Sequence, residues 1–325
     1  MRIDNDLRRC VVFLGFKDDS PGMGGIWCVG TGFLFFYKNA AYLATVKHVA
    51  KELNESPFVV RVNRPNGVAI NIETDQVKWY YHNDDNVDIA ITECTLITNM
   101  FDAIYLEESV ISGIEENNIG IGDNCYTIGL FRLMFGKMRN LPIVHTGNIA
   151  MVPGDEKIPV EDWDNPPKSK PKYIEGYLIE SQSLNGLSGA PVFARPTIDC
   201  PIGRKDNEGI LGSLLAIKNI FLIGIWQGAW NAPPDKILAA EIERGKMVRV
   251  SLGMGVVVPI TKLIELLEMP ELQKRRDQIN AEHDAKVHAA ELDSVRVPSQ
   301  MDNPQHKEDF NSLVTAATKK KKQDD

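Results

Sequence analysis

The sequence predicts an all-β fold. Short runs of β-branched and aromatic residues recur between residues 9 and 258, and turn residues separate them at spacings typical of a barrel or a sandwich. Strands do not alternate with long helices, which argues against an α/β fold. The chain of 325 residues is 43% hydrophobic, which is enough to build a sizeable core.

The β-prone runs fall into two series along the chain, and each series is expected to form a barrel. Short helices are expected as well, at residues 47–53, 235–244 and 260–268. The first series comprises residues 9–16, 25–37, 41–46, 57–63, 67–73, 77–82 and 88–95, and the second comprises residues 124–130, 142–152, 173–181, 191–194, 219–227 and 246–258.

Residues 185–193, Asn-Gly-Leu-Ser-Gly-Ala-Pro-Val-Phe, form the most informative segment. A serine hydroxyl is a poor nucleophile, so a serine hydrolase needs backbone N–H groups that point at the carbonyl oxygen under attack. Glycine at 186 and 189 permits the required curl of the chain. The segment predicts a nucleophilic Ser188, with the amides of Gly186 and Ser188 as an oxyanion hole.

A nucleophilic serine also needs a base and a carboxylate that orients the base. His48 follows two apolar runs, residues 30–36 and 41–46, whose connection at residues 37–40 reads as a hairpin turn. Asp88 stands at the start of another apolar run. The candidates therefore occur in the order His48, Asp88, Ser188.

With these segments and the later runs at 221–228 and 254–260, the chain resembles the trypsin-like (chymotrypsin-fold) serine peptidases over roughly residues 8–268. The resemblance implies two packed six-stranded antiparallel β-barrels with the site in the cleft between them. It also implies that His48 is the general base, Asp88 its orienter and Ser188 the nucleophile.

The resemblance further implies where a substrate would bind. The walls of the first subsite are expected from Gln182 and Ser183 and from the strand that carries Trp226, Gln227 and Gly228. The same strand is expected to pair with an extended substrate. Because Gln182 is uncharged, no strong preference for Lys or Arg is expected.

Three positions depart from the family pattern. Leu187 replaces the aspartate that pairs with a newly cut N-terminus, so activation by clipping near residue 1 is not expected. Ala190 replaces a glycine and would narrow the cleft by one methyl. Lys47 precedes the histidine, and a nearby ammonium would lower the proton affinity of His48.

Each candidate residue also has a plain structural interpretation. A histidine after a strand is often structural, Asp88 could satisfy backbone donors, and the serine segment could be an ordinary turn. Asp84 and Asp85 are alternatives for the orienter, and His82 and His145 for the base. An α/β-hydrolase is excluded because its acid and histidine follow the serine, whereas the later histidines, His283, His288 and His306, lie in a polar region.

Composition narrows the cofactors and partners. The five cysteines contain no C-x-x-C pair, which argues against disulfide scaffolding and a zinc site. No metal or organic cofactor is expected. The net charge of −8 disfavours nucleic-acid binding. The charged residues 1–9 and the lack of any run of about 18 apolar residues predict a soluble, cytoplasmic protein without a membrane segment.

The predicted organisation is a peptidase domain over residues 1–268, a charged helical extension over 269–298 and a disordered polar tail over 299–325. The domain would contain an N-terminal barrel at about 8–110, a C-terminal barrel at about 120–259 and a closing helix at 260–268. We expect a serine endopeptidase that acts on protein or peptide substrates, with regulation by a protein partner or a restricted substrate range. The alternative is a catalytically silent fold that serves as a protein-binding or regulatory module.

Overall fold

The structure is a computed structural model. It describes residues 3–20, 24–54, 56–74, 77–94, 96, 100–111, 119–154, 156–160, 172–181, 185–197, 220–231 and 251–295, with residues 231, 251–252 and 283–295 described in their backbone only. Contacts divide the chain into residues 1–276 and 277–325. The β-sheets and the candidate site residues lie in the first unit.

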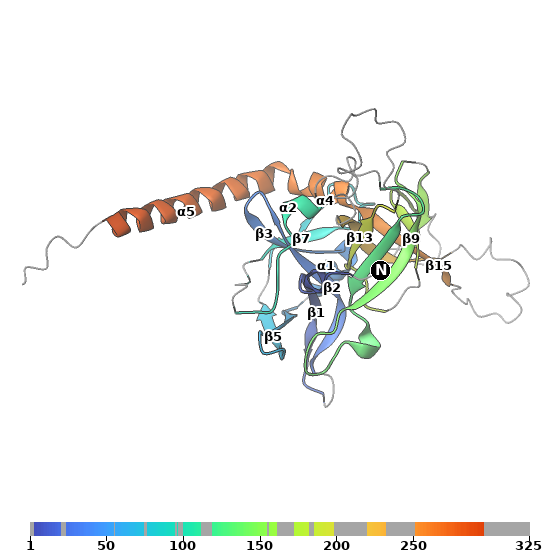
Figure 1. Ribbon diagram of the computed structural model, residues 1–325, viewed down its shortest axis with the longest axis horizontal. Helices are drawn as coiled ribbons and strands as arrows, with labels where there is room; N and C mark the ends of the chain where they lie inside the picture. Colours follow the sequence, from blue (N-terminus) through green and yellow to red (C-terminus); the bar gives the residue numbers. More distant parts are fainter. Residues whose placement is uncertain are drawn as a thin grey trace, which may run out of the picture. The chain divides into compact units, whose positions relative to one another are not determined.

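The first half of the chain forms one antiparallel sheet of seven strands (Figure 1), in the order β5-β4-β1-β2-β3-β7-β6. The expected turn at residues 37–40 is present: Lys38 and Asn39 have φ values of 46° and 64°, as a two-residue hairpin loop of type I′ requires. The strands are β1 (Val11–Asp18), β2 (Gly25–Tyr37), β3 (Ala40–Thr45), β4 (Phe58–Asn63), β5 (Ala69–Thr74), β6 (Tyr80–Tyr81) and β7 (Ala90–Glu93).

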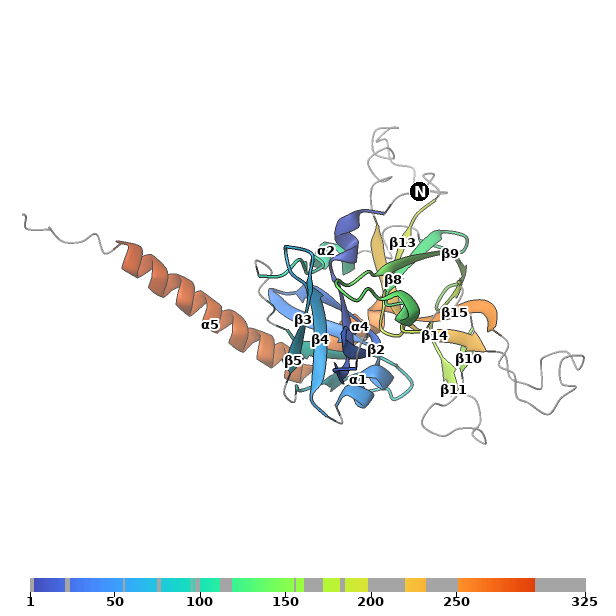
Figure 2. The same cartoon turned by 90° about the horizontal axis from the view of Figure 1, so that it is seen from below.

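The second half forms a closed six-stranded barrel (Figure 2), in the order β12-β15-β14-β13-β8-β9. A separate two-stranded sheet pairs β10 (Ile158–Val160) with β11 (Lys172–Ile174). The barrel strands are β8 (Asn124–Gly129), β9 (Ile143–Met151), β12 (Tyr177–Glu180), β13 (Pro191–Arg195), β14 (Phe221–Asn231) and β15 (Ser251–Pro259).

The all-β class and the six-stranded second barrel are confirmed. Two details differ from the expectation. Among the described strands, the first half forms a sheet of seven strands with edges at β5 and β6 rather than a closed barrel of six, and the short β6 pairs with the outer side of β7. The run predicted at 173–181 is two strands, since β11 ends at Ile174 and β12 begins at Tyr177.

Helices are few in the described part of the chain. Two of the expected helices are present as α1 (Lys47–Leu53) and α4 (Ile260–Leu267), and the charged extension is helical as α5 (Pro270–Val295). The helix expected at 235–244 and the tail at 299–325 lie outside the described residues. Shorter turns of helix are η1 (Asn5–Arg8), α2 (Glu108–Ile111) and η3 (Arg132–Met134). None of the helices described combines the length and apolarity needed to cross a bilayer.

The largest hydrophobic cluster joins the two halves. It contains core residues of the first sheet, such as Leu43, together with Phe193 of β13 and Leu263 of α4. A second cluster fills the closed barrel and includes Leu187 and Trp226. The serine segment is therefore supported from both sides by packed apolar residues.

Candidate active site

His48 and Asp88 are brought together by neighbouring strands. Thr45 at the end of β3 is opposite Ala90 at the start of β7, so the segments that flank this pair lie side by side. Asp88 Oδ2 lies 2.7 Å from His48 Nδ1, and Asp88 Oδ1 accepts the backbone N–H of His48 at 3.0 Å. One carboxylate therefore fixes both the ring and the backbone of the histidine.

This contact sets the roles of the two ring nitrogens of His48. A carboxylate can only accept a hydrogen bond, so the proton of the neutral ring lies on Nδ1 and Nε2 is the acceptor nitrogen. The Asp88 side chain is 13% exposed and that of His48 is 38% exposed. The histidine is accessible while its orienting carboxylate is shielded.

Ser188 lies in a tight loop between β12 and β13. Gly186 and Gly189 have φ values of 105° and 87°, in the region where only glycine is unstrained. The Ala190 amide donates to Leu187 O at 2.8 Å, which closes the turn. Leu187 and Ala190 are completely buried, so the two departures from the family pattern pack into the core.

The carbonyl oxygens of residues 185–188 all accept hydrogen bonds. In a planar trans peptide the C=O of one residue and the N–H of the next point in opposite directions. A hydrogen bond accepted by each of these carbonyls therefore directs the N–H of the following residue away from that bond. Within the described chain, the amides of Gly186 and Ser188 donate to no carbonyl. The four bonds are Arg132 N to Asn185 O at 3.1 Å, Thr31 Oγ1 to Gly186 O at 2.7 Å, Ala190 N to Leu187 O at 2.8 Å and Thr31 N to Ser188 O at 2.9 Å.

The histidine helix and the serine loop meet at Gly30 of β2. A Cβ atom added to Gly30 would lie 2.8 Å from Val49 Cγ2 and 3.0 Å from Ser188 O. Val49 follows His48 directly, so the segment that carries His48 and the segment that carries Ser188 both pack against Gly30. Ser188 Oγ donates to Gln227 O at 3.4 Å, which is longer than an ordinary O–H···O bond.

The residues expected to line the first subsite have different environments. Gln182 and Ser183 lie outside the described residues. Trp226 is 1% exposed, and its backbone N and O are both bonded to the serine loop, at Ala190 O and Gly189 N. It therefore supports the loop from within the barrel.

Gln227 and Gly228 lie further along β14. Gln227 is 9% exposed, and its Oε1 atom is buried without a partner among the described residues. A Cβ added to Gly228 would meet no atom within 4 Å. β14 pairs with β13 only from Phe221 to Ile225, whereas its pairing with β15 extends to Asn231, so its later part has one strand edge unpaired by the described strands.

Three of the four alternative candidates, His82, Asp84 and Asp85, have structural partners elsewhere. His82 Nε2 lies 3.1 Å from Glu265 Oε2, and Asp84 Oδ1 accepts the Asn86 amide.

Asp85 forms a 2.8 Å ion pair with Lys47, and this hydrogen bond lowers the pKa of Asp85. The charge of Lys47 is thus compensated beside His48. On β9, burial lowers the pKa of His145.

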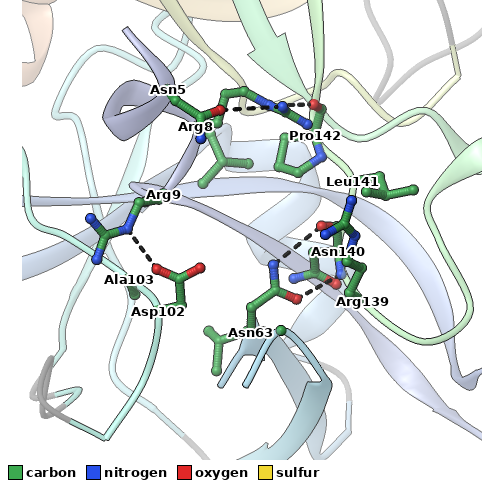
Figure 3. Close-up of a pocket in the computed structure, with 13 residues that line it drawn as sticks. Asn5, Arg8, Arg9, Asn63, Asp102, Ala103, Arg139, Asn140, Leu141 and Pro142 are labelled. Atoms are coloured by element: carbon green, nitrogen blue, oxygen red, sulfur yellow. Dashed lines mark hydrogen bonds and ion pairs between the residues drawn. The ribbon is translucent and has the colours of Figure 1, made fainter. Parts of the chain in front are cut away.

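A cavity of about 190 Å³ lies between η1, β4 and the segment that precedes β9 (Figure 3). None of the predicted site residues lines it. Asn63 and Asn140 exchange two hydrogen bonds there, from Asn140 N to Asn63 Oδ1 at 2.7 Å and from Asn63 Nδ2 to Asn140 O at 3.2 Å. Buried Arg61 donates to Asn140 Oδ1 at 2.9 Å. These contacts fasten the segment after β8 to the first sheet.

Sequence reasoning missed two residues that hold the serine loop, Thr31 and Arg132. Thr31 belongs to the apolar run at residues 30–36, which predicts the hairpin and contributes to the family resemblance but indicates no contact with the serine loop. Arg132 follows β8, and besides its backbone bond to Asn185 its guanidinium donates to Val29 O. Both contacts join distant parts of the chain, so the local pattern carried no signal for them.

Comparisons with known proteins give no sequence match and only low-scoring structural likenesses. No protein-family model matches the chain, and no curated protein matches it in sequence. An inactive form of the Rv3671c protease has 14% identity and a TM-score of 0.43, covering 80% of this chain and 88% of that chain. The active form from M. tuberculosis has 14% identity and a TM-score of 0.41, covering 80% of each chain. Likenesses of this size say nothing about activity.

Proposed function

We propose that the chain is a serine endopeptidase in which His48, Asp88 and Ser188 act together. One observation carries the proposal: the histidine held by Asp88 lies on the helix that meets the serine loop at Gly30, and two amides of that loop have no carbonyl partner in the described chain. Base, orienter, nucleophile and anion donors are the parts that acyl transfer requires.

In the first half of the reaction, Ser188 Oγ attacks the carbonyl carbon of a peptide bond as His48 Nε2 accepts the hydroxyl proton. Asp88 holds the ring and stabilises its protonated form. The amides of Gly186 and Ser188 donate to the oxyanion of the tetrahedral intermediate, and one such donor typically contributes about 2.7–4 kcal/mol.

In the second half, His48 gives its proton to the leaving amine and the peptide C–N bond breaks. The acyl group remains as an ester on Ser188 Oγ. A water molecule then attacks this ester as His48 accepts a proton from it, and collapse of the second intermediate releases the carboxylic acid and regenerates the hydroxyl. No metal or organic cofactor takes part.

The substrate class follows from the edge of β14. An extended peptide can add to a strand edge through its backbone hydrogen bonds, with side-chain pockets giving specificity. The edge beyond Ile225 is not paired by any of the described strands and can bind an extended segment of a protein or peptide, which supports a peptide substrate. We propose no strong preference for Lys or Arg, since Gln182 is uncharged.

A catalytically silent module is the second candidate, and one contact favours it. Ser188 Oγ lies 3.4 Å from Gln227 O, an acceptor that competes with the base for the single hydroxyl proton. Because the 3.4 Å bond is long, a small rotation about χ1 would release the hydroxyl. A regulatory partner that favours the rotated state would turn the silent form into the active one.

A fluorophosphonate probe separates the two functions, because it labels only an activated serine. We expect one label per chain in the wild type, none in Ser188→Ala and normal labelling in Ser20→Ala, which changes an exposed serine. Absence of labelling in the wild type, alone and with cell extract, would support the silent module. Sequencing of new N-termini in a proteome treated with wild type or Ser188→Ala then defines the cleavage preference.

A further inference from the structure

Thr31 of β2 is a buried residue at the junction of the first sheet and the closed barrel. It is 0% exposed. Its hydroxyl accepts the Leu130 amide at 2.9 Å and donates to Gly186 O at 2.7 Å. A hydroxyl has one proton to donate, and here that proton is committed to the serine loop.

The backbone of Thr31 adds two further bonds. Its amide donates to Ser188 O at 2.9 Å, and its carbonyl accepts Thr45 Oγ1 at 2.8 Å. The surroundings are tight, because a Cβ added to Gly189 would lie 2.1 Å from Thr31 O. The residue has no room to shift without moving the loop.

The hydroxyl of Thr31 bridges two segments of the second half of the chain by hydrogen bonds. It links Leu130 to Gly186, and the next contact between the same segments is direct, from Arg132 N to Asn185 O at 3.1 Å. That second bond orients the peptide group between Asn185 and Gly186. Since the peptide is planar, it also sets the direction of the Gly186 N–H.

We propose that Thr31 is a positioning residue whose hydroxyl keeps the Gly186 amide directed at the developing oxyanion. The inference rests on the proposed peptidase function. Without the hydroxyl, Gly186 O and the Leu130 amide lose their partner in a buried place, and the loop relaxes to satisfy them. The peptide that carries the Gly186 N–H then rotates away, while His48 and Asp88 are untouched.

The test compares three variants under steady-state conditions with a peptide ester or amide substrate. Thr31→Val keeps the side-chain shape but removes the hydroxyl, and Thr31→Ser keeps the hydroxyl. Thr127→Val is the matched control, because Thr127 is 1% exposed and its Oγ1 has no partner among the described residues. We expect kcat to fall about 10²-fold in Thr31→Val, as for loss of one oxyanion donor, with KM nearly unchanged. Thr31→Ser and Thr127→Val should stay within about threefold of the wild type, as changes that remove no donor.

Two further readouts separate positioning from a general loss of structure. A peptide aldehyde forms a tetrahedral adduct with an oxyanion, so its affinity should fall in parallel with kcat in Thr31→Val. The acidic limb of the pH–rate profile should not move, because the base and its carboxylate are intact. If Thr31→Val does not fold, Thr31→Cys replaces it: the thiol is a weaker donor of similar size, and an intermediate loss is expected.

The inference is overturned if Thr31→Val matches the wild type in kcat and aldehyde affinity, or if Thr31→Ser is as impaired as Thr31→Val. In either case a wild type that reacts with the fluorophosphonate leaves the peptidase proposal standing. A wild type that never reacts would remove both.

Discussion

Asp88 holds His48 at two points, since its Oδ1 accepts the backbone amide at 3.0 Å and its Oδ2 lies 2.7 Å from Nδ1. Asp88→Asn replaces an acceptor with a group that can donate, so the ring no longer needs to carry its proton on Nδ1. We expect kcat to fall about 10⁴-fold, the size that loss of the correct tautomer produces in a triad. Initial rates on a peptide substrate measure the effect.

Asp85→Asn is the control for this experiment. Asp85 belongs to the same short segment, but its side chain is 94% exposed and pairs with Lys47. Its replacement should change kcat by less than about threefold, because exposed ion pairs contribute little. Equal losses in the two variants would contradict the assignment of Asp88.

Gly189→Ala should disable the serine loop. The glycine has a φ of 87°, and its added Cβ would lie 2.1 Å from Thr31 O and 2.2 Å from Thr45 Oγ1. We expect loss of fluorophosphonate labelling together with a lower thermal midpoint, because both strain and a steric clash oppose the native loop. In Gly120→Ala, where the new Cβ meets no atom within 4 Å, labelling should persist; its loss there would refute the argument.

Asn140→Ala should lower the free energy of unfolding by about 2–3 kcal/mol. The change leaves buried Arg61 without the Asn140 Oδ1 acceptor and Arg61 O without the Asn140 Nδ2 donor, which lies 2.6 Å away. Urea titration measures the loss. Asn5→Ala removes an exposed amide beside the same cavity and should stay within about 0.5 kcal/mol of the wild type; a comparable loss would contradict the prediction.

Glu268 should make stability depend on pH at the junction of α4 and α5. A hydrogen bond from Lys38, supported by Tyr37 and Gln273, lowers the pKa of Glu268 from 4.5 to about 2. A carboxyl with a depressed pKa stabilises the fold fully above its ordinary value, and this contribution is lost as the pH falls from 4.5 towards about 2. Glu268→Gln should therefore unfold at lower urea than the wild type at neutral pH.

The pH series completes this test. The difference between Glu268→Gln and the wild type should shrink as the pH falls through that window, because the wild-type carboxyl becomes neutral too. Glu156→Gln changes an exposed carboxylate and should follow the wild-type curve. A gap that stays constant down to about pH 2 would mean that Glu268 stabilises the junction by packing rather than by charge.

Local patterns were sufficient for much of the fold. The run predicted at 25–37 coincides with β2 and the helix predicted at 47–53 coincides with α1, because alternation of apolar residues and the hairpin at Lys38 and Asn39 are local signals. The break between β11 and β12 was not predicted. Gly176 lies in this break, and an added Cβ would be 2.9 Å from Val257 O, a constraint that arises only when β15 is in place.

Only part of the candidate site could be predicted, because some of its contacts arise only in the assembled fold. The approach of Asp88 to His48 was expected from the family resemblance, whereas strand patterns alone did not predict the pairing of β3 with β7 that brings the two residues together. The supporting contacts of the serine loop were not predicted, since Thr31, Arg132 and Trp226 reach it from three separate strands or turns. Whether the three predicted catalytic residues act together stays a prediction for the labelling experiment.

The shared hydrophobic cluster has a consequence for synthesis of the chain. Leu43 and its neighbours in the first sheet pack in the same core as Leu263 of α4, which leaves the ribosome after both sets of strands. The nascent chain must therefore carry uncovered apolar surface throughout most of its translation. Exposed apolar surface of this kind makes an incomplete chain prone to aggregation until α4 and the start of α5, which adds Leu272 to the same cluster, have emerged.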